Sequence, residues 1–346
     1  MKKVTLFLSL MITSITFAQE TSPATTFGGS ADAYYKYDFS TMEQPISTSF
    51  TSANDSFQIG MASIEAAHKF GKGSVFVDLG FGSRASEFTY NDQANTFMIK
   101  QLTFTYDITD KFKVTMGSFA THLGYELMDA VDNKNYSMSY AFTNGPFFNT
   151  GIKAQYTAGK FSFMAGVSNP TDFKSAVDAG GTTNKTFIGQ VGYVADSGSL
   201  YFNFTSGSNN TSSVKNITQY DIVGSKKLSD AFTLGFNGTY AIVNDDFDSS
   251  LDGAWFSLVG YANYAFKSNL NLAYRLEYFD DKDALATTPI AGSVLGNTLS
   301  LNYKVGNLTI IPEFRFDSSS EDVFYDSDGA GTNSNTYVLL ATTYTF

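Results

Sequence analysis

The sequence predicts an all-β protein: a transmembrane antiparallel β-barrel of about 16 strands, with short periplasmic turns and long extracellular loops. Three observations predict this fold class. Apolar and polar residues alternate along most of the chain, short turn-like connections alternate with longer polar stretches, and the segment 336–346 is apolar, β-branched and aromatic. A terminal strand of that kind must be paired along both edges, and a closed barrel supplies the second edge.

The alternation has a period of two residues. In the segment 270–278, one face carries the apolar residues Leu270, Leu272, Tyr274, Leu276 and Tyr278. The opposite face carries Asn271, Ala273, Arg275 and Glu277, and the segments 232–242 and 299–305 repeat the pattern. Such a period is typical of strands with one polar face, and no convincing helical period competes with it. No apolar run after residue 18 is long enough for a helical membrane span.

The connections divide the chain into strands. Seven short ones, rich in Gly, Asn, Asp and Ser, lie at 70–73, 109–111, 158–160, 195–198, 228–230, 267–269 and 305–307. Longer stretches lie near 40–56, 85–95, 120–148, 170–185, 207–217, 244–252, 281–293 and 318–334. Both termini then fall on the short-turn, periplasmic side, and Phe346 closes the last strand against the first, near 31–39. The alternative, a soluble sandwich, would bury its apolar faces on one side only.

The N-terminus predicts secretion. Lys2 and Lys3 precede an apolar stretch at 4–17, and Ala18 completes a small-residue cleavage site. We therefore expect a secretory signal peptide at 1–18, rather than a buried helix, and one outer-membrane barrel domain at 19–346. The chain has no cysteine, so neither disulfides nor thiolate metal sites are expected.

The composition indicates the environment and the partners. Aromatic residues make up 16% of the chain, with 33 Phe and 21 Tyr, yet the mean hydropathy is only −0.11. This fits a barrel whose aromatic girdles face outer-membrane lipids. The net charge of −11 argues against nucleic acid as a partner. The terminal Tyr344 and Phe346 resemble the signal read by the outer-membrane barrel assembly machinery. The predicted location is the outer membrane of a Gram-negative (diderm) bacterium, reached after secretion to the periplasm.

Strand parity assigns charged residues to the lumen. The candidate pore-lining residues are Asp78, Arg84, Lys153, Arg275, Glu277, Glu313, Arg315 and Asp317. Opposed charges across a pore select among hydrated solutes, and they also pair simply to satisfy a polar interior. Parity places Lys100 with Leu102 and Phe104 on the lipid face, where a lysine needs a rim position, a snorkelling side chain or a β-bulge.

The segment 120–148 is the longest predicted loop. Its candidate functional residues are Glu126, Tyr136, Phe142, Pro146 and Phe147. An aromatic-rich loop of this length without secondary structure is usually functional. We expect it to fold into or across the lumen as a constriction loop, the alternative being a loop packed on the outer rim.

Other kinds of site find little support in the sequence. The chain has two histidines, His68 and His122, with neither a G-x-S-x-G nor an H-E-x-x-H motif, so no catalytic residues, bound metal or cofactor are expected. Acidic clusters in the outer loops offer oxygen ligands for Ca²⁺, but a solvated surface is the expected role. These clusters comprise Asp245, Asp246, Asp248 and Asp252; Asp280, Asp281 and Asp283; and Glu321, Asp322, Asp326 and Asp328.

The segment 123–172 resembles the signature region of the OmpL-like outer-membrane β-barrel porin family. The matching residues are Gly124, Tyr125, Glu126, Asn135, Tyr136, Ser137, Ser139, Phe142, Pro146, Phe147, Gly151, Tyr156, Gly166, Asn169 and Asp172. The family usually has glycine and an aromatic residue where this chain has Pro170 and Thr171. The resemblance implies an outer-membrane, porin-like barrel and no particular solute.

Together these features predict a porin: a water-filled channel for passive diffusion of small hydrophilic solutes or ions. The N-terminal segment is too short for the plug of an active-uptake receptor, and a polar lumen disfavours a hydrophobic-substrate channel. The alternative is a non-conducting outer-membrane barrel that acts through its extracellular loops, in adhesion or as a structural protein. Analogy with porins of this strand number extends the expectation to a homotrimer.

Overall fold

Sixteen antiparallel strands form a closed barrel in the computed structural model, which describes residues 25–91, 98–176, 184–208, 215–245 and 248–346. The barrel strands are β1 (Thr25–Asp38), β2 (Ser56–Phe70), β3 (Gly73–Phe81), β4 (Ile99–Thr109), β5 (Phe112–Ala120), β6 (Phe148–Ala158), β7 (Phe161–Ser168), β8 (Thr186–Ala195), β9 (Gly198–Ser208), β10 (Lys215–Lys227), β11 (Phe232–Asp245), β12 (Gly253–Lys267), β13 (Leu270–Asp281), β14 (Gly292–Val305), β15 (Leu308–Ser319) and β18 (Ser334–Thr345). The predicted strand number and fold class are confirmed. The predicted signal peptide lies outside the described residues.

The barrel closes between its first and last strands, as the sequence predicted. β1 pairs with β18 from Ser30 opposite Thr345 to Asp38 opposite Tyr337. Beyond that register, the backbones of Gly29 and Phe346 exchange two hydrogen bonds, so the C-terminal residue completes the seam. Closure satisfies the backbone groups of both terminal strands, as a bilayer requires.

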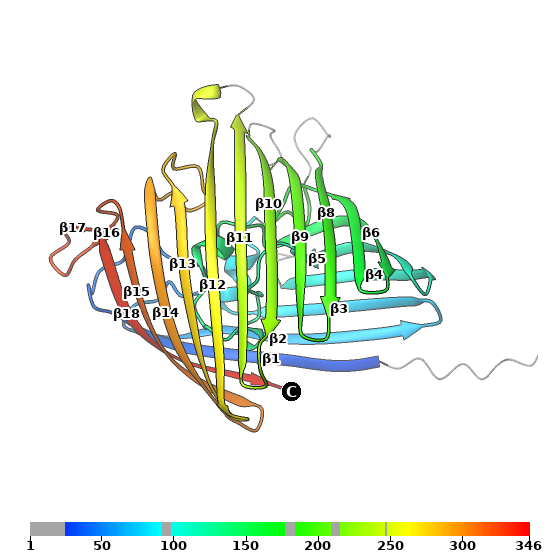
Figure 1. Cartoon of the computed structure of the whole chain (residues 1–346), viewed down its shortest axis with the longest axis horizontal. Coiled ribbons are helices and arrows are strands. Elements are labelled where there is room, and N and C mark those ends of the chain that lie inside the picture. The colour runs from blue at the N-terminus through cyan, green and yellow to red at the C-terminus, as the bar shows by residue number, and fades with distance from the viewer. Residues whose placement is uncertain (1–24, 92–97, 177–183, 209–214, 246–247) are drawn as a thin grey trace, which may run out of the picture.

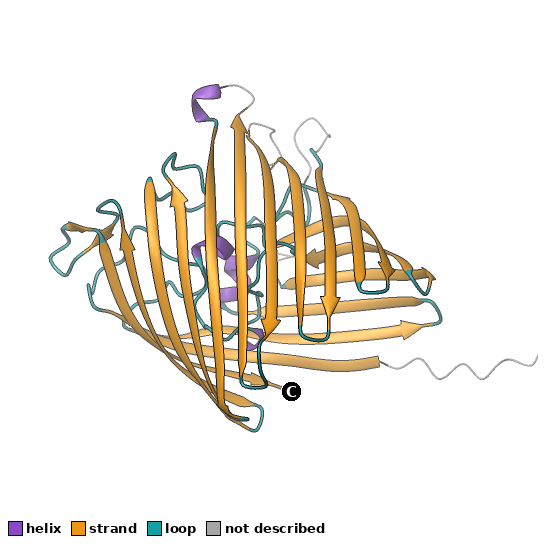
Figure 2. Ribbon diagram, in the orientation of Figure 1, coloured by secondary structure: helices purple, strands orange, loops and turns teal. Residues whose placement is uncertain are grey.

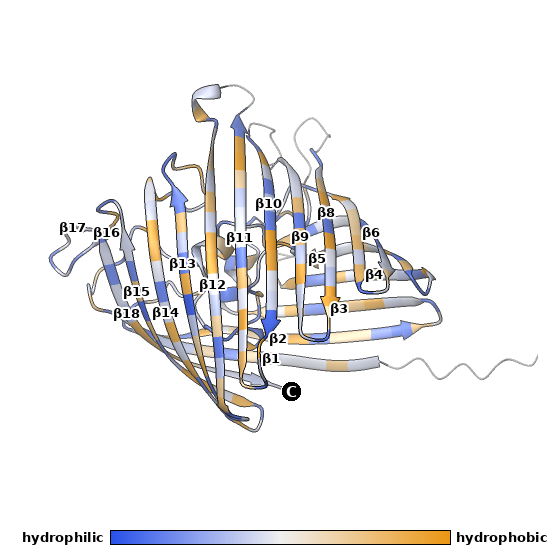
Figure 3. Ribbon diagram, in the orientation of Figure 1, coloured by the Kyte–Doolittle hydropathy of each residue, from blue (hydrophilic) through white to orange (hydrophobic). Residues whose placement is uncertain are grey.

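The strands show two chemically different faces. On β13, Tyr274 and Leu276 are 38% and 42% exposed on the outside, whereas Arg275 and Glu277 on the inside are each 1% exposed. Figure 3 shows this alternation of hydrophobic and hydrophilic residues along the strands in front. Local sequence therefore decides which face meets lipid and which meets the lumen.

The connections lie at two rims. Seven short turns join β2–β3, β4–β5, β6–β7, β8–β9, β10–β11, β12–β13 and β14–β15. In Figure 1 these turns and the C-terminus follow the lower and right edge, and the longer connections lie at the opposite rim. The last long connection contains a small hairpin of β16 (Phe324–Tyr325) and β17 (Gly331–Thr332).

Short helical segments occur where the sequence predicted only loops. They are α1 (Ser83–Phe88), η1 (Ala130–Asp132), α2 (Tyr140–Thr143) and η2 (Ser249–Leu251), and Figure 2 shows helical turns in the centre of the view. All are too short to create a recognisable helical period. None of the described helices is long and apolar enough to cross a membrane.

The structure corrects the strand position of Arg84 and confirms the β-bulge that was one of three alternatives for Lys100. β3 ends at Phe81, so Arg84 lies on α1 in the connection to β4 rather than on a strand, although its side chain is buried inside the barrel. The β3–β4 register shifts between Asp78 opposite Gln101 and Leu79 opposite Ile99, which leaves Lys100 as the extra residue of a bulge. The bulge turns Lys100 away from the lipid face and into the interior, where it is 1% exposed.

The interior is less uniformly polar than the sequence predicted. One apolar cluster contains Ile46, Tyr140, Ala241, Val243, Trp255, Phe279, Ala286, Ile290, Val294 and Phe324. A second contains Phe50, Met61, Ala85, Phe88, Met128, Met138, Phe142, Phe147 and Phe148. Both combine inward strand residues with residues of the long connections. In these two clusters, inward apolar strand residues pack against a connection that excludes water.

Candidate functional site

The connection between β5 and β6, residues 121–147, lies inside the barrel and is called the inner loop here. Tyr136 is fully buried within it, and Phe142 is 7% exposed. The inner loop bonds to opposite sides of the wall: Glu126 pairs with Arg275 on β13, and Asp129 pairs with Lys100 on β4 at 2.7 Å. The loop therefore spans the lumen.

Arg275 is one anchor of the inner loop. Its guanidinium contacts the Glu126 carboxylate and the Ser137 carbonyl, and it donates to the Met138 carbonyl at 3.1 Å. It also donates to the Thr298 hydroxyl on β14 at 3.0 Å. Charge-assisted bonds of this kind hold a loop against a wall more firmly than neutral ones do.

Two acidic side chains of the wall bind backbone N–H groups of the inner loop. Glu313 accepts from Tyr136 N at 2.7 Å and from Ser137 N at 3.1 Å. Glu277 accepts from Ala141 N at 3.0 Å. The donors come from a loop without ladder partners, so the carboxylates replace the missing β-sheet bonds.

Arg315 and Asp317 extend the same contact surface. Asp317 accepts two bonds from Arg315 Nε at 2.9 Å each and one from the Tyr140 hydroxyl at 3.1 Å. Arg315 donates to the Met138 carbonyl at 2.7 Å and stands over the Tyr140 ring. Both predicted pore-lining residues therefore face the inner loop.

Arg84 links α1 to the inner loop. Its guanidinium lies between the rings of Phe50 and Tyr136, 4.7 Å and 5.1 Å from their centroids. It donates to the Met128 carbonyl at 3.1 Å, and the Tyr136 hydroxyl donates to Asp32 on β1. A buried cation flanked by two rings and a carboxylate fixes this side of the loop.

Lys100 forms a second buried ionic cluster at the bulge. Its ammonium group lies 2.9 Å from Asp78 and 2.7 Å from Asp129 of the inner loop, and it donates to the Ser63 hydroxyl at 2.7 Å. Asp78 was predicted to line the pore, and its partner Lys100 was assigned to the lipid face by parity. The bulge is what brings the two together.

The remaining predicted residues lie in separate places. Lys153 on β6 stands 3.9 Å over the Phe119 ring, away from the acidic groups above. Phe142 and Phe147 stack at 5.4 Å between centroids within the second apolar cluster, next to the buried Pro146. Tyr344 and Phe346 are 43% and 65% exposed at the seam.

Asp172, in the connection after β7, holds the C-terminal end of the inner loop. One of its carboxylate oxygens accepts from Phe147 N at 2.7 Å and from Phe148 N at 3.0 Å. The other accepts from the Tyr90 hydroxyl at 3.0 Å. Complete burial raises the pKa of Asp172 to about 6, because desolvation outweighs these bonds.

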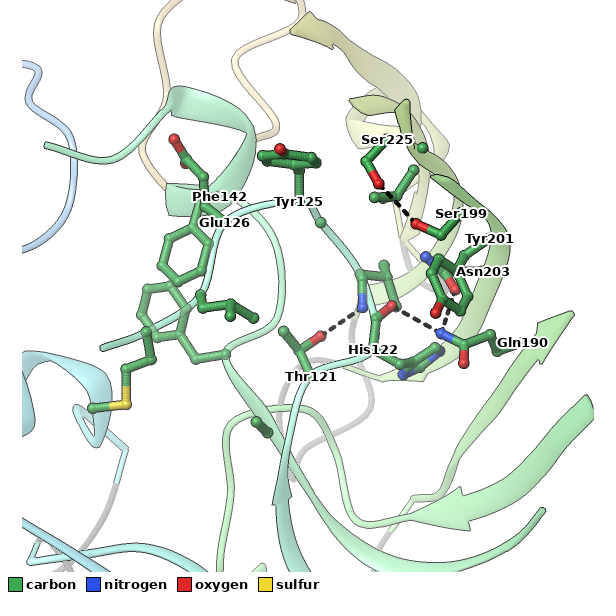
Figure 4. A pocket seen from close by; sticks show the side chains of 18 residues that line it. Thr121, His122, Tyr125, Glu126, Phe142, Gln190, Ser199, Tyr201, Asn203 and Ser225 are labelled. Atoms are coloured by element: carbon green, nitrogen blue, oxygen red, sulfur yellow. Dashed lines mark hydrogen bonds between the residues drawn. The ribbon is translucent and has the colours of Figure 1, made fainter. Parts of the chain in front are cut away.

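A cavity of about 410 Å³ lies between the inner loop and the wall made by β8, β9 and β10. Figure 4 shows Tyr125 and Phe142 on one side, with Gln190, Asn203, Ser199 and Ser225 across the space. A second cavity of about 360 Å³ shares Tyr125 and Glu126 and reaches Asp230 in the β10–β11 turn. Part of the lumen thus stays open on the short-turn side.

The outer-loop aspartates bind backbone groups. Asp281 accepts from Leu285 N, Ala286 N and Ile290 N, and Asp326 accepts from Asp328 N and Ala330 N. Asp246 lies outside the described residues. In the part of the chain that the structure describes, no group of three or more potential ligands is close enough to hold a metal ion.

Several contributors to this arrangement had no site role predicted from the sequence. Asp129 and Ser139 lie in the inner loop without a parity pattern, and Asp172 lies in another connection. Ser139 and Asp172 both match the family signature, and Ser139 also precedes α2, where its hydroxyl accepts from Phe142 N as a helix cap. Asp32 on β1 and Asp221 on β10 are buried strand residues, and strand parity does not identify the inner-loop groups that they bind.

Solved structures share this architecture at low sequence identity. An anion-selective porin from Comamonas acidovorans has a TM-score of 0.64 at 12% identity, covering 94% of this chain and 100% of that one. The outer-membrane channel DcaP of Acinetobacter baumannii has a TM-score of 0.61 at 13% identity, covering 95% and 99%. OmpF of Salmonella typhi, solved in complex with daunomycin, has a TM-score of 0.64 at 12% identity, covering 93% and 97%. At such identities the likeness shows the fold alone.

Sequence comparison identifies the family. No curated protein sequence matches the chain. Residues 24–346 match the family described as "Putative beta-barrel porin-2, OmpL-like", which covers every strand of the barrel. The resemblance inferred from the segment 123–172 is therefore confirmed over nearly the whole chain. This protein belongs to the family of OmpL-like β-barrel porins.

Proposed function

We propose that this porin-like barrel is a passive, water-filled channel for small hydrophilic solutes in the outer membrane of a Gram-negative bacterium. The observation that carries the proposal is the pairing of a closed barrel with an inner loop that leaves one side of the lumen open. An open cavity between loop and wall is the arrangement that a size-limited diffusion channel needs. The inner loop acts as the constriction, and Glu126, Tyr136, Phe142, Pro146 and Phe147 hold its shape.

The charges of the lumen act chiefly on the loop. Arg275, Glu277, Glu313, Arg315 and Asp317 all contact the inner loop, as the distances above describe. We infer that they position the constriction more than they attract ions from solution. This favours a channel with weak ion selectivity.

Conductance tests the proposal directly. The refolded full chain, without its signal peptide, is placed in a planar bilayer under a salt gradient. Stable conductance steps with a small reversal potential are expected. A correctly folded barrel that stays silent at every voltage would reject the channel.

A second candidate is a non-conducting barrel that acts through its outer loops. The observation in its favour is the first apolar cluster, in which Ile46, Ala286, Ile290 and Phe324 from long connections pack onto Trp255 and Phe279. This cluster fixes parts of three long connections against the inner face of the wall. A silent barrel would favour this candidate over the channel.

Secretion and assembly follow from the same proposal. We propose that residues 1–18 direct export to the periplasm and that the assembly machinery recognises Tyr344 and Phe346. The long connections then face outward, and the exposed aromatic residues of the strands contact lipid. A homotrimer is proposed on the analogy with porins. The proposal assigns no enzymatic role.

A further inference from the structure

We propose that the cavity between the inner loop and the β8–β10 wall binds a neutral polyhydroxylated solute, such as a monosaccharide or disaccharide. The inference rests on the proposed channel, whose substrate class it names. Its volume of about 410 Å³ falls within the range of roughly 300–1,000 Å³ typical of small-molecule sites.

The residues that line the cavity leave no charge free to bind an ion. Of the residues that line it, only Glu126 has an acidic side chain, and both oxygens of its carboxyl group are engaged by Arg275 and Ser139. His122 is neutral, because burial lowers its pKa to about 4, and its Nε2–H donates to the Phe204 carbonyl at 3.0 Å. An ion entering this space would lose water without meeting a counter-charge.

The wall behind the cavity is neutralised as well. Asp221 on β10 accepts hydrogen bonds from Gly124 N, Asn203 Nδ2 at 2.7 Å, Asn237 Nδ2 and the Thr239 hydroxyl at 2.8 Å. Four donors around one carboxylate leave little capacity for a cation. Asp221 is thus occupied by hydrogen bonds within the protein.

The wall of the cavity supplies uncharged hydrogen-bond donors and acceptors. Gln190 Nε2 donates to Asn203 Oδ1 at 2.8 Å and to the His122 carbonyl at 3.5 Å, and no described residue uses its Oε1. The hydroxyls of Ser199 and Ser225 pair at 3.0 Å on the same wall. Hydroxyls and amides can each bond to a sugar hydroxyl, which is both donor and acceptor.

This polar surface continues along the barrel beyond the cavity. In the strand registers, Thr205 and Gln219 are opposite each other, one inward step above Asn203 and Asp221, and Ser257 lies opposite Thr239. Thr205, Gln219 and Ser257 are 3%, 4% and 1% exposed. Within the described chain, Thr205 Oγ1, Gln219 Oε1 and Ser257 Oγ have no hydrogen-bond partner. Such atoms are costly to bury unless water or a solute bonds to them.

The inner-loop side of the cavity is aromatic. Tyr125 stacks on Tyr261 at 4.1 Å between centroids, and Phe142 and Phe147 also line the space. In Figure 4, Tyr125 and Phe142 lie across from Gln190 and Ser199. A sugar ring combines apolar C–H faces with polar edges, so one rigid aromatic side and one hydroxyl-and-amide side match it.

The test compares three solutes of nearly equal size and different charge. Glucose, gluconate and glucosamine are added in turn to single channels of the full mature chain. Glucose is expected to interrupt the current in a concentration-dependent way, with an apparent affinity at least about tenfold higher than either ion. Equal effects of all three solutes, or no effect of glucose, would overturn the inference while leaving the channel itself intact.

Two variants of one residue locate the site. Gln190→Met keeps the side-chain length without its amide and is expected to weaken glucose binding about three- to tenfold. Gln190→Glu introduces a charge and should weaken glucose while strengthening glucosamine. The matched control, Thr105→Val, removes a wall hydroxyl that bonds to Thr115 outside the cavity and should leave glucose affinity unchanged. A loss of affinity in the control but not in Gln190→Met would place the sugar elsewhere.

A folded barrel that conducts no current would refute the channel and not the sugar site. Equilibrium dialysis of the detergent-solubilised full chain against radiolabelled glucose then reports binding without conduction. Binding that Gln190→Met weakens supports the sugar site in a non-conducting barrel. Absence of binding in this assay overturns the inference as well.

Discussion

At the scale of single residues, the buried ion pairs decide how the inner loop is held. Glu126 and Arg275 are 149 positions apart in sequence, and their side chains are 4% and 1% exposed. Bringing both charges out of water is costly, so the pair stabilises the protein only while both members remain. The contribution of the pair to stability is therefore best tested by removing one member.

Glu126→Ala leaves Arg275 without its carboxylate partner. We expect the free energy of unfolding to fall by about 3–5 kcal/mol, the range for a buried charge that loses its partner. Urea unfolding of the barrel in detergent micelles measures it. The control is Asp230→Ala, which removes the exposed partner of Lys227 and should leave stability unchanged. A decrease in the free energy of unfolding no larger than that of the control would show that water or other polar groups replace Glu126 as partners of Arg275.

Asp172→Asn tests the pH dependence of the end of the inner loop. The pKa of Asp172 is raised to about 6 in the fold, above its ordinary value of 3.8, because the carboxyl is buried. The folded state therefore holds an extra proton between about pH 4 and pH 6, so stability falls as pH rises through this window and then levels off. Two pKa units correspond to about 3 kcal/mol.

The asparagine variant should lack this loss, because its amide oxygen can still accept from Phe147 N and Phe148 N and it does not titrate. Unfolding free energies of wild type and variant from pH 4 to pH 8 give the comparison. Parallel curves for the two proteins would mean that Asp172 does not titrate in this range.

At the scale of elements, the inner loop and the bulge in β4 act on the barrel from within. The strands alone would enclose a wide lumen, and the inner loop reaches both Asp221 on β10 and Arg275 on β13. The bulge at Lys100 adds a cationic contact to Asp129 that a regular strand would turn toward lipid. Irregular segments thus determine how much of the lumen is open, while regular strands form the wall.

Deleting 127–141 should raise single-channel conductance several-fold, because it removes the part of the inner loop that contacts Glu313, Glu277 and Arg315. The released wall charges become hydrated in a wider lumen, so the barrel should still form. Conductance of the refolded variant gives the result. As a control, deleting 326–330 removes the exposed tip of the β16–β17 hairpin and should not change conductance. Unchanged conductance in the inner-loop deletion would mean that another segment limits the pore.

At the scale of the whole molecule, closure is the property on which the fold depends. The seam joins the two ends of the chain, and its last bonds are those between Gly29 and Phe346. The Phe346 ring stacks near Tyr344 at 6.4 Å between centroids and remains exposed at the rim. Its contribution to packing is therefore small, and its proposed role is recognition during assembly.

Phe346→Ala should lower the amount of folded barrel in the outer membrane of cells, while the purified variant still refolds in detergent. The reason is that the substitution keeps the backbone bonds of the seam and removes the exposed ring. The folded fraction in isolated outer membranes and the refolding yield in vitro are the two measurements. Ile108→Ala, an exposed apolar residue near a different turn, is the control. A parallel loss in cells and in detergent would instead assign Phe346 to barrel stability.

The sequence by itself determined the barrel, its sixteen strands, its closing partners and most of the inward charges. These properties depend on a period of two residues and on local turn chemistry. Both are determined by residues that are close together in the sequence. The inward positions of Arg275, Glu277, Glu313, Arg315 and Asp317 followed from that period alone.

Only the tertiary structure decided which of these charges meet, how the inner loop crosses the lumen and where the cavity remains. The contacts of Glu126 with Arg275 and of Tyr136 with Glu313 join residues more than a hundred positions apart. A β-bulge of one extra residue moves the Lys100 side chain from the lipid face to the interior. The inward side chains of Trp255 and Phe279 pack against apolar loop residues. Such contacts depend on the path of irregular segments, whose sequences have no periodicity from which that path could be predicted. They form only within the closed barrel.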